Sequence, residues 1–116
     1  MGGVALGWTA TDFSVLDVNP NSARFNQAVS PKDYLKHVSG WYSELHVGYC
    51  SGQFGHLDTL QAELATAGTK VPIQILGVND VGYESGNASV TAGRTLPWLQ
   101  ATAMADVWKD WSPTYR

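Results

Sequence analysis

The order of apolar and polar positions along the chain predicts alternating strands and helices. Residues 12–18 and 37–47 are rich in β-branched and aromatic residues, and residues 70–80 form a nearly continuous apolar run, so each is expected to be a strand. Between the last two, apolar positions recur with the 3.6-residue period of a helix. They are Cys50, Phe54, Leu57, Leu60 and Leu64. A helix between two parallel strands predicts the fold class α/β.

Short signals set the ends of these elements. Asn and Pro in "NPNS" (19–22) predict a turn after the first strand, and Ser30 followed by proline is typical of a helix N-cap. Gly68 is expected to end the main helix. Residues 81–95 are polar and rich in glycine and are predicted to form a loop. A last helix is expected from about Thr102, with four apolar residues on one face: Met104, Val107, Trp108 and Trp111.

Length and composition narrow the class of protein. The chain has 116 residues, of which 44% are hydrophobic and 15% are charged, and its net charge is −3. These values fit a single globular domain over residues 1–116, and they exclude a disordered chain. Lysine and arginine do not cluster, so we expect no nucleic-acid partner. No window approaches the roughly 18 consecutive apolar residues of a membrane span, so we expect none.

The N-terminus and the single cysteine bear on the location of the protein. The opening "MGGVALGWTATDF" lacks the basic start and the sustained apolar run of a secretion signal. This predicts a cytoplasmic protein, unless a leader has been removed. Cys50 is the only cysteine, so an internal disulfide is excluded. The triplet "NAS" at 87–89 matches a glycosylation acceptor, and without a leader we attribute it to chance.

Cys50 follows a strand and opens a helix, a position that can activate a thiol. The free N–H groups of a helix start favour an anion and lower the pKa of a thiol there. A dithiol site has two sulfurs about one turn apart: the first attacks a substrate disulfide, and the second, more buried, releases it. Cys50 has the position of the second sulfur, and Val47 stands where the first would be. An inert core cysteine is the other interpretation.

Three segments carry a resemblance to a known family: "WYSELHVGYCSGQFGHLDTLQAEL" (41–64), "VPIQILGVND" (71–80) and "LPWLQ" (96–100). In this order and spacing they resemble the thioredoxin-fold redoxins. That group includes extracytoplasmic thiol–disulfide oxidoreductases, peroxiredoxin-like proteins and the N-terminal domain of selenoprotein P. The likeness covers roughly residues 11–111, because the segment before the first quoted one is also similar to redoxin N-terminal extensions. It implies a thioredoxin-like fold, with a central sheet flanked by helices.

The resemblance also implies a site. In the family a C-x-x-C, or its selenocysteine variant, opens the helix, and a cis-proline on a facing loop lies beside the sulfurs. "VGYC" occupies that slot here, which implies Cys50 as the catalytic residue, and Pro97 is the candidate cis-proline. Trp41 and Trp98 are implied to flank a groove for a partner peptide. The implied substrate-binding residues are Val47, Gly48, Tyr49, Leu96, Pro97 and Trp98.

Val47 removes the attacking sulfur, so two functions stay open. In the first, Cys50 supports a monothiol oxidoreductase that forms mixed disulfides with protein or peptide thiols or with glutathione. In the second, the chain is a non-catalytic peptide- or protein-binding module on a thioredoxin fold. A degenerate peroxiredoxin is a weaker alternative, because Val47 has no hydroxyl to orient a peroxide and only Arg94 is a candidate to approach through the fold. His46 and His56 lack the paired spacing of a zinc site, so we expect no metal and no cofactor.

The C-terminus departs from the family pattern. In the redoxins the segment after the proline leads into an antiparallel strand pair and a closing helix, whereas this sequence stops at "WSPTYR" (111–116). We therefore expect a fold that is truncated at its C-terminal end. A second copy, a partner chain or a missing segment would then complete the sheet, since an unpaired strand edge invites association.

Overall fold

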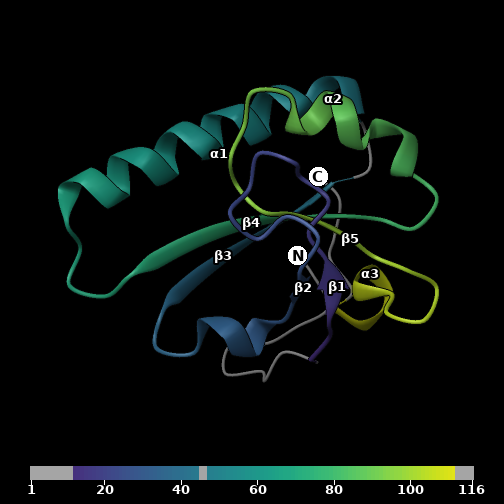
Figure 1. The fold of residues 1–116 in the computed structure, drawn as a ribbon, viewed down its shortest axis with the longest axis horizontal. Helices are drawn as coiled ribbons and strands as arrows, with labels where there is room; N and C mark the ends of the chain where they lie inside the picture. The colour runs from purple at the N-terminus through teal and green to yellow at the C-terminus, as the bar shows by residue number, and fades with distance from the viewer. Residues whose placement is uncertain (1–11, 45–46, 112–116) are drawn as a thin grey trace.

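The computed structural model describes residues 12–44 and 47–111, and for residues 44, 47–51 and 108 it describes the backbone alone. The described residues form a sheet of three parallel strands, β3, β4 and β5, with β4 in the centre. Helices α1 and α2 lie on one face of this sheet, and the hairpin β1–β2 and α3 lie on the other side (Figure 1). The chain therefore has the predicted α/β class.

The predicted strand–helix–strand unit is present. β3 (Val38–Glu44) and β4 (Ile73–Asn79) pair in parallel over the seven residues of each strand. α1 (Val47–Ala67) connects them, since parallel neighbours need a crossover. The helix ends before Gly68, whose φ of +70° is a left-handed conformation that favours glycine. The helix, its end and the central strand are confirmed, whereas the strand predicted over residues 37–47 is confirmed only over Val38–Glu44, because Val47 already belongs to α1.

The segment after β4 contains three elements that were not predicted. The expected loop over residues 81–95 holds the short helices η2 (Glu84–Gly86) and α2 (Asn87–Thr91). β5 (Trp98–Gln100) then pairs in parallel with the end of β4. These elements are three, five and three residues long. Elements this short do not show the periodicity by which longer ones are recognised.

Each face of the sheet carries its own core, because alternate residues of a strand point to opposite faces. On the helix side, Ile75 of β4 and Trp98 of β5 pack with Phe54 of α1 and Val90 of α2. The core on the other side joins the strands to the hairpin and α3: Phe13, Val15, Val29, Leu76, Val78, Leu99, Ala101 and Val107. β4 is thus covered on both faces, as its continuous apolar run predicts.

Gly77, in the middle of β4, lets the indole of Trp98 lie against the strand backbone. A Cβ built at Gly77 would overlap Cε3 and Cζ3 of Trp98 and would lie 2.8 Å from Cε1 of Phe54. The ring centroids of Phe54 and Trp98 are 4.9 Å apart, and both side chains are buried. A residue without a side chain is therefore a packing requirement at this position.

The apolar face of α1 is only partly as predicted. Phe54 is fully buried, and Leu57 and Leu64 pack against the same cluster. Leu60, which was assigned to this face, is 41% exposed. The reason is angular: at about 100° per residue, Leu60 lies about 120° around the helix from Phe54, whereas Gln61 lies only about 20° away. A polar residue thus occupies the centre of the sheet-facing side.

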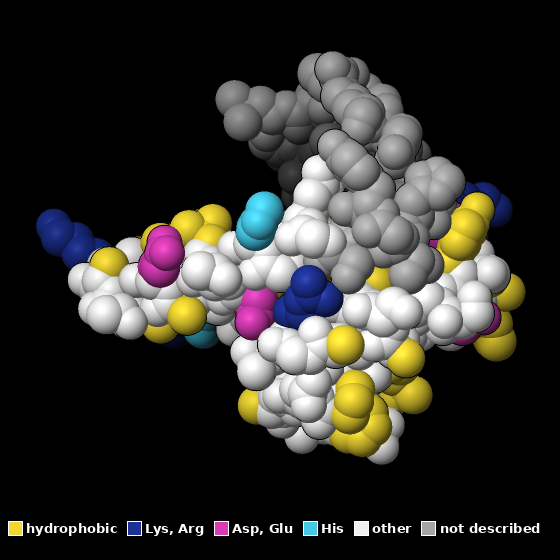
Figure 2. Space-filling model, turned by 90° about the horizontal axis from the view of Figure 1, so that it is seen from above, with side chains coloured by type: hydrophobic (Ala, Val, Ile, Leu, Met, Phe, Trp, Pro, Cys, Tyr) yellow, Lys and Arg dark blue, Asp and Glu magenta, His cyan; other side chains and the backbone are white. Residues whose placement is uncertain are grey.

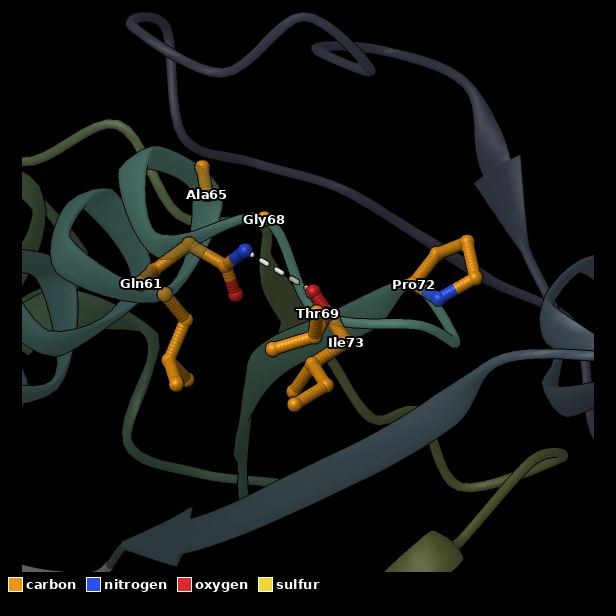
Figure 3. Close-up of a pocket in the computed structure, with 7 residues that line it drawn as sticks. Gln61, Ala65, Gly68, Thr69, Pro72 and Ile73 are labelled. Carbon is orange, nitrogen blue, oxygen red and sulfur yellow. Dashed lines mark hydrogen bonds between the residues drawn. The ribbon is translucent and has the colours of Figure 1, made fainter.

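Gln61 uses this position to hydrogen-bond the backbone of β4. Its Nε2 donates to the carbonyl of Ile73 (2.9 Å; Figure 3), and its Oε1 accepts from the N–H of Ile75 (2.8 Å). These groups lie on the edge of β4 that β5 covers only from Gly77 onward. The side-chain amide therefore takes the hydrogen bonds that a neighbouring strand would otherwise make.

We expect Gln61→Leu to lower the free energy of unfolding by about 2–3 kcal/mol, because leucine leaves the N–H of Ile75 and the carbonyl of Ile73 without their partners. Urea denaturation measures the change. Glu63→Leu, at an exposed position of the same helix, is the control and should stay within about 0.5 kcal/mol of the wild type. Equal stability of the two variants would show that these backbone groups find water instead.

The N-terminal strand is shorter than predicted. β1 (Val15–Leu16) pairs antiparallel with β2 (Ala28–Val29), so the strand expected over residues 12–18 is confirmed only in its centre. The helix start that was predicted from Ser30 is confirmed: the 3-10 helix η1 (Pro31–Tyr34) begins after it with a complete capping box.

Asp17 and Asn19 connect the hairpin to the segment around β5. Oδ1 of Asp17 accepts from the backbone N–H of Trp98 (3.2 Å) and from that of Asn19 (2.9 Å). Nδ2 of Asn19 donates to the carbonyls of Arg94 (2.9 Å) and Leu96 (2.7 Å). Both Asp17 and Asn19 are fully buried. The predicted turn is therefore an internal link as well as a reversal of the chain.

The C-terminal helix is also shorter than expected. α3 covers Val107–Trp111, and the residues just before it form turns. Val107 is buried as predicted, whereas Met104 is completely exposed and the prediction for it is wrong. Trp111 packs against the core cluster on the side of the sheet opposite α1. The side chain of Trp108 lies outside the described part of the structure.

Candidate functional site

The carboxyl ends of three parallel strands meet at one edge of the sheet. Glu44 of β3, Asn79 of β4 and Gln100 of β5 are neighbours in the register. α1 begins at Val47, shortly after β3 ends, so its first turn rises from this edge. In open α/β sheets ligands bind outside the carboxyl ends of the strands. The backbone therefore places Cys50 at the start of the helix that follows a strand, as predicted.

The first turn of α1 consists of Val47, Gly48, Tyr49 and Cys50. Their side chains lie outside the described part of the structure, so the burial of the sulfur and the lowered thiol pKa stay predictions. The next turn is described: Phe54 is fully buried, and Tyr42 stacks on it with ring centroids 6.5 Å apart. Positions four apart share one face of a helix, so position 50 is on the face that Phe54 turns toward the sheet.

A network of side-chain amides holds the connection between β4 and α2 at this edge. Nδ2 of Asn79 donates to Oε1 of Gln100 and to Oδ1 of Asn87, both at 3.0 Å. Nδ2 of Asn87 donates to the same Gln100 oxygen (3.0 Å), and its Oδ1 accepts from Nε1 of Trp98 (2.7 Å). Nε2 of Gln100 donates to the carbonyl of Asp80 (3.0 Å). Such a satisfied network rigidifies its surroundings.

Sequence reasoning missed this network. The available signal was an amide residue at the carboxyl end of two apolar segments, Asn79 and Gln100. These residues are 4% and 9% exposed, and buried amides are almost always paired. Their pairing follows only once "LPWLQ" is recognised as a strand beside β4.

Two predictions about "LPWLQ" are wrong. The described residues contain no cis peptide bond, so Pro97 is trans. Its carbonyl accepts from the N–H of Gly77 (3.0 Å), which draws the segment into a strand beside β4. Trp98 is 1% exposed, so its ring does not face a partner peptide. β4 also separates β5 from β3 by two strand spacings, about 9–10 Å.

Leu96 and Pro97 instead border a cavity of about 360 Å³ that reaches the loop after β1. Arg24 and Tyr34 also line it. The Arg24 guanidinium is paired with Asp33 at 3.0 Å, and burial raises the pKa of Tyr34. A second cavity of about 240 Å³ lies at the far end of α1 (Figure 3). The described lining of the first cavity is mainly amide and hydroxyl groups beside Arg24, and that of the second is mainly aliphatic, and we assign no site to either.

Arg94, which the peroxiredoxin alternative requires near the thiol, lies across α1. Its Nη2 is 2.8 Å from the position that a Cβ would take at Gly55, and its Nη1 donates to the carbonyl of Val90 (3.3 Å). Gly55 comes five residues after Cys50, about 7.5 Å farther along the helix axis. The contact of Arg94 with α1 is therefore established, and its approach to the thiol stays a prediction.

The surface over α1 mixes charges of both signs. Figure 2 shows basic and acidic side chains next to one another on this face instead of in separate blocks. Within the described ranges, no helix is long and apolar enough to cross a membrane. The same residues include no group of three His, Cys, Asp or Glu side chains that could hold a metal ion. Because basic side chains over α1 lie next to acidic ones, the described part of this face offers nucleic acid no continuous basic surface.

Comparison with known proteins gives no match. No protein-family model matches the chain, and no curated protein or solved structure matches it significantly. The assignment of a function therefore depends on the topology, on the position of Cys50 and on the resemblance of the sequence.

Proposed function

We propose that this chain is a thioredoxin-like protein that acts as a monothiol redox protein through Cys50. The observation that supports this most is the position of Cys50 in the first turn of a 21-residue helix that follows a parallel strand. The unsatisfied N–H groups of such a helix start favour a thiolate. The crossover β3–α1–β4 is also the unit in which the resemblance places a redox cysteine.

The proposed reaction is thiol–disulfide exchange. The thiolate of Cys50 attacks one sulfur of oxidised glutathione or of an exposed protein disulfide. A new S–S bond forms to Cys50, the old S–S bond breaks, and the second sulfur leaves as a thiolate. A glutathione thiolate then attacks the mixed disulfide and restores Cys50. Because Cys50 is the only cysteine, the chain has no second sulfur that could resolve the mixed disulfide, so an external thiol is required.

Val47 itself favours a second candidate function, a non-catalytic module that binds a peptide or protein. A valine can neither attack a disulfide nor form one, and it stands where a dithiol enzyme has its attacking sulfur. Cys50 would then be a small apolar packing residue. The two candidates differ in the reactivity of Cys50 in the folded protein.

Labelling with a thiol reagent over a range of pH separates the two candidates. The monothiol proposal expects the folded chain to be labelled with a pH midpoint below about 8.5, the pKa of an unperturbed thiol. Because Cys50 is the only cysteine, the label reports on it alone, and Cys50→Ser is the blank. Labelling that occurs only in denaturant would contradict the monothiol proposal and support the binding module.

A further inference from the structure

The outer edge of β3 carries backbone groups that β4 does not use. The N–H of Val38 donates toward β4, to the carbonyl of Pro72 (2.9 Å), and successive residues of a strand point these groups to alternate sides. The N–H and C=O groups of Ser39, Trp41 and Ser43 therefore point away from β4. In the described ranges, no strand pairs with this edge (Figure 1).

Of the features by which edge strands are usually protected, β3 has only one charged residue, Glu44, at its end. Its seven residues, "VSGWYSE", include no proline and no lysine. They pair with β4 in unbroken register, so the strand has no bulge. Protected edges are short, bulged, charged or interrupted by proline. β3 is therefore able to accept a further strand.

We propose that this edge pairs antiparallel with β3 of a second copy of the chain, about a two-fold axis at Trp41. The outward residues are spaced evenly around Trp41, so the register is self-complementary. Trp41 faces Trp41 of the partner subunit, and Ser39 faces Ser43 of the partner subunit. In such pairs the two residues exchange both N–H···O bonds. The outward groups of all three residues are then satisfied, and two sheets become one.

The side chains that face the helices fit the same register. Gly40 and Tyr42 flank Trp41, so Gly40 lies opposite Tyr42 of the partner subunit. A cavity of about 260 Å³ lies beside Gly40, and Leu57 and Ile75 contribute to its lining. An aromatic ring opposite an edge glycine covers the exposed backbone and stabilises the pair. This match of a small and a large residue within one strand favours a second copy over an unrelated peptide.

Sedimentation equilibrium from about 5 µM to about 1 mM chain tests the proposal. We expect a weak dimer in this range, because two paired strands bury less than the roughly 1,600 Å² of a standard interface. Ser43→Pro removes an outward N–H from each copy and should weaken dimerisation about tenfold or more. Ser43→Ala keeps that N–H and is the matched control. A wild-type chain that stays monomeric throughout, or a dimer that both variants leave unchanged, would overturn the proposal.

A charge exchange tests the register. Ser39→Lys combined with Ser43→Lys places like charges opposite one another and should abolish the dimer in this concentration range. Ser39→Lys combined with Ser43→Glu places opposite charges together and should restore it. Both variants lose the hydrogen bond from Nε1 of Trp41 to Ser39, so this loss cancels in the comparison. Equal dissociation constants would overturn the register. Slow hydrogen exchange of the Trp41 backbone amide in a dilute, monomeric sample would show that another part of the same chain covers the edge of β3. That result would also overturn the proposal.

Discussion

Gly77→Ala is expected to lower the free energy of unfolding by more than about 3 kcal/mol, at the upper end of the cost of overpacking a core. The added methyl group would overlap the ring of Trp98 and would lie 2.8 Å from Phe54. Trp98 has little freedom to withdraw, since it is buried and its Nε1 donates to Asn87 at 2.7 Å. Urea denaturation followed by tryptophan fluorescence measures the loss.

Gly52→Ala is the matched control for this substitution. A Cβ at Gly52 would meet no atom within 4 Å, and the position lies inside α1. Alanine is favoured over glycine in a helix by about 1 kcal/mol, so this variant should be slightly more stable than the wild type. Should Gly77→Ala cost less than about 1 kcal/mol, the packing of Trp98 on β4 would be much looser than these contacts indicate.

Val47→Cys is expected to convert the chain into a dithiol oxidoreductase. Positions 47 and 50 are three residues apart in the first turn of α1, which brings their Cβ atoms to about 5–6 Å. Disulfides join residues whose Cβ atoms are about 3.5–4.5 Å apart, so a bridge requires the two Cβ atoms to approach by about 1–2 Å. Reduction of insulin by dithiothreitol, catalysed by the variant, should proceed at least about tenfold faster than with the wild type.

Mass spectrometry and two controls make this result specific. Oxidised Val47→Cys should be lighter than its reduced form by the mass of two hydrogen atoms. Val47→Ser has one thiol, so the same oxidation should leave its mass unchanged. Val47→Cys combined with Cys50→Ser retains one thiol and should lose the gain in rate. A Val47→Cys chain that forms no internal disulfide while folded would show that the start of α1 does not have the geometry of a dithiol site.

The long elements could be predicted because their patterns are local. β4 is a continuous apolar run, and α1 repeats apolar residues over several turns before Gly68 ends it. The order of these elements was sufficient to infer the parallel crossover. The position of Cys50 at the start of the helix followed from the same local reading.

The parts that depend on distant partners could not be predicted. β5 is three residues long, and it is a strand only because Pro97 and the residues after it meet β4. The isomer of Pro97 was inferred from a family pattern, and the pairing with β4 overrides it. The role of Gln61 could not be inferred from the helical pattern, because its backbone partners lie on another element. The amide network of the candidate site was missed for the same reason.

The amide network also limits chemical modification of the chain. Asn87 begins the triplet "NAS", which is the recognition pattern for an asparagine-linked sugar. The nitrogen that would carry the sugar instead donates to Gln100, and the oxygen of the same group accepts from Trp98. A glycosyltransferase therefore meets an engaged amide in the folded chain. Attachment before folding would force a bulky polar group between the ends of two strands and would oppose the packing of this edge of the sheet.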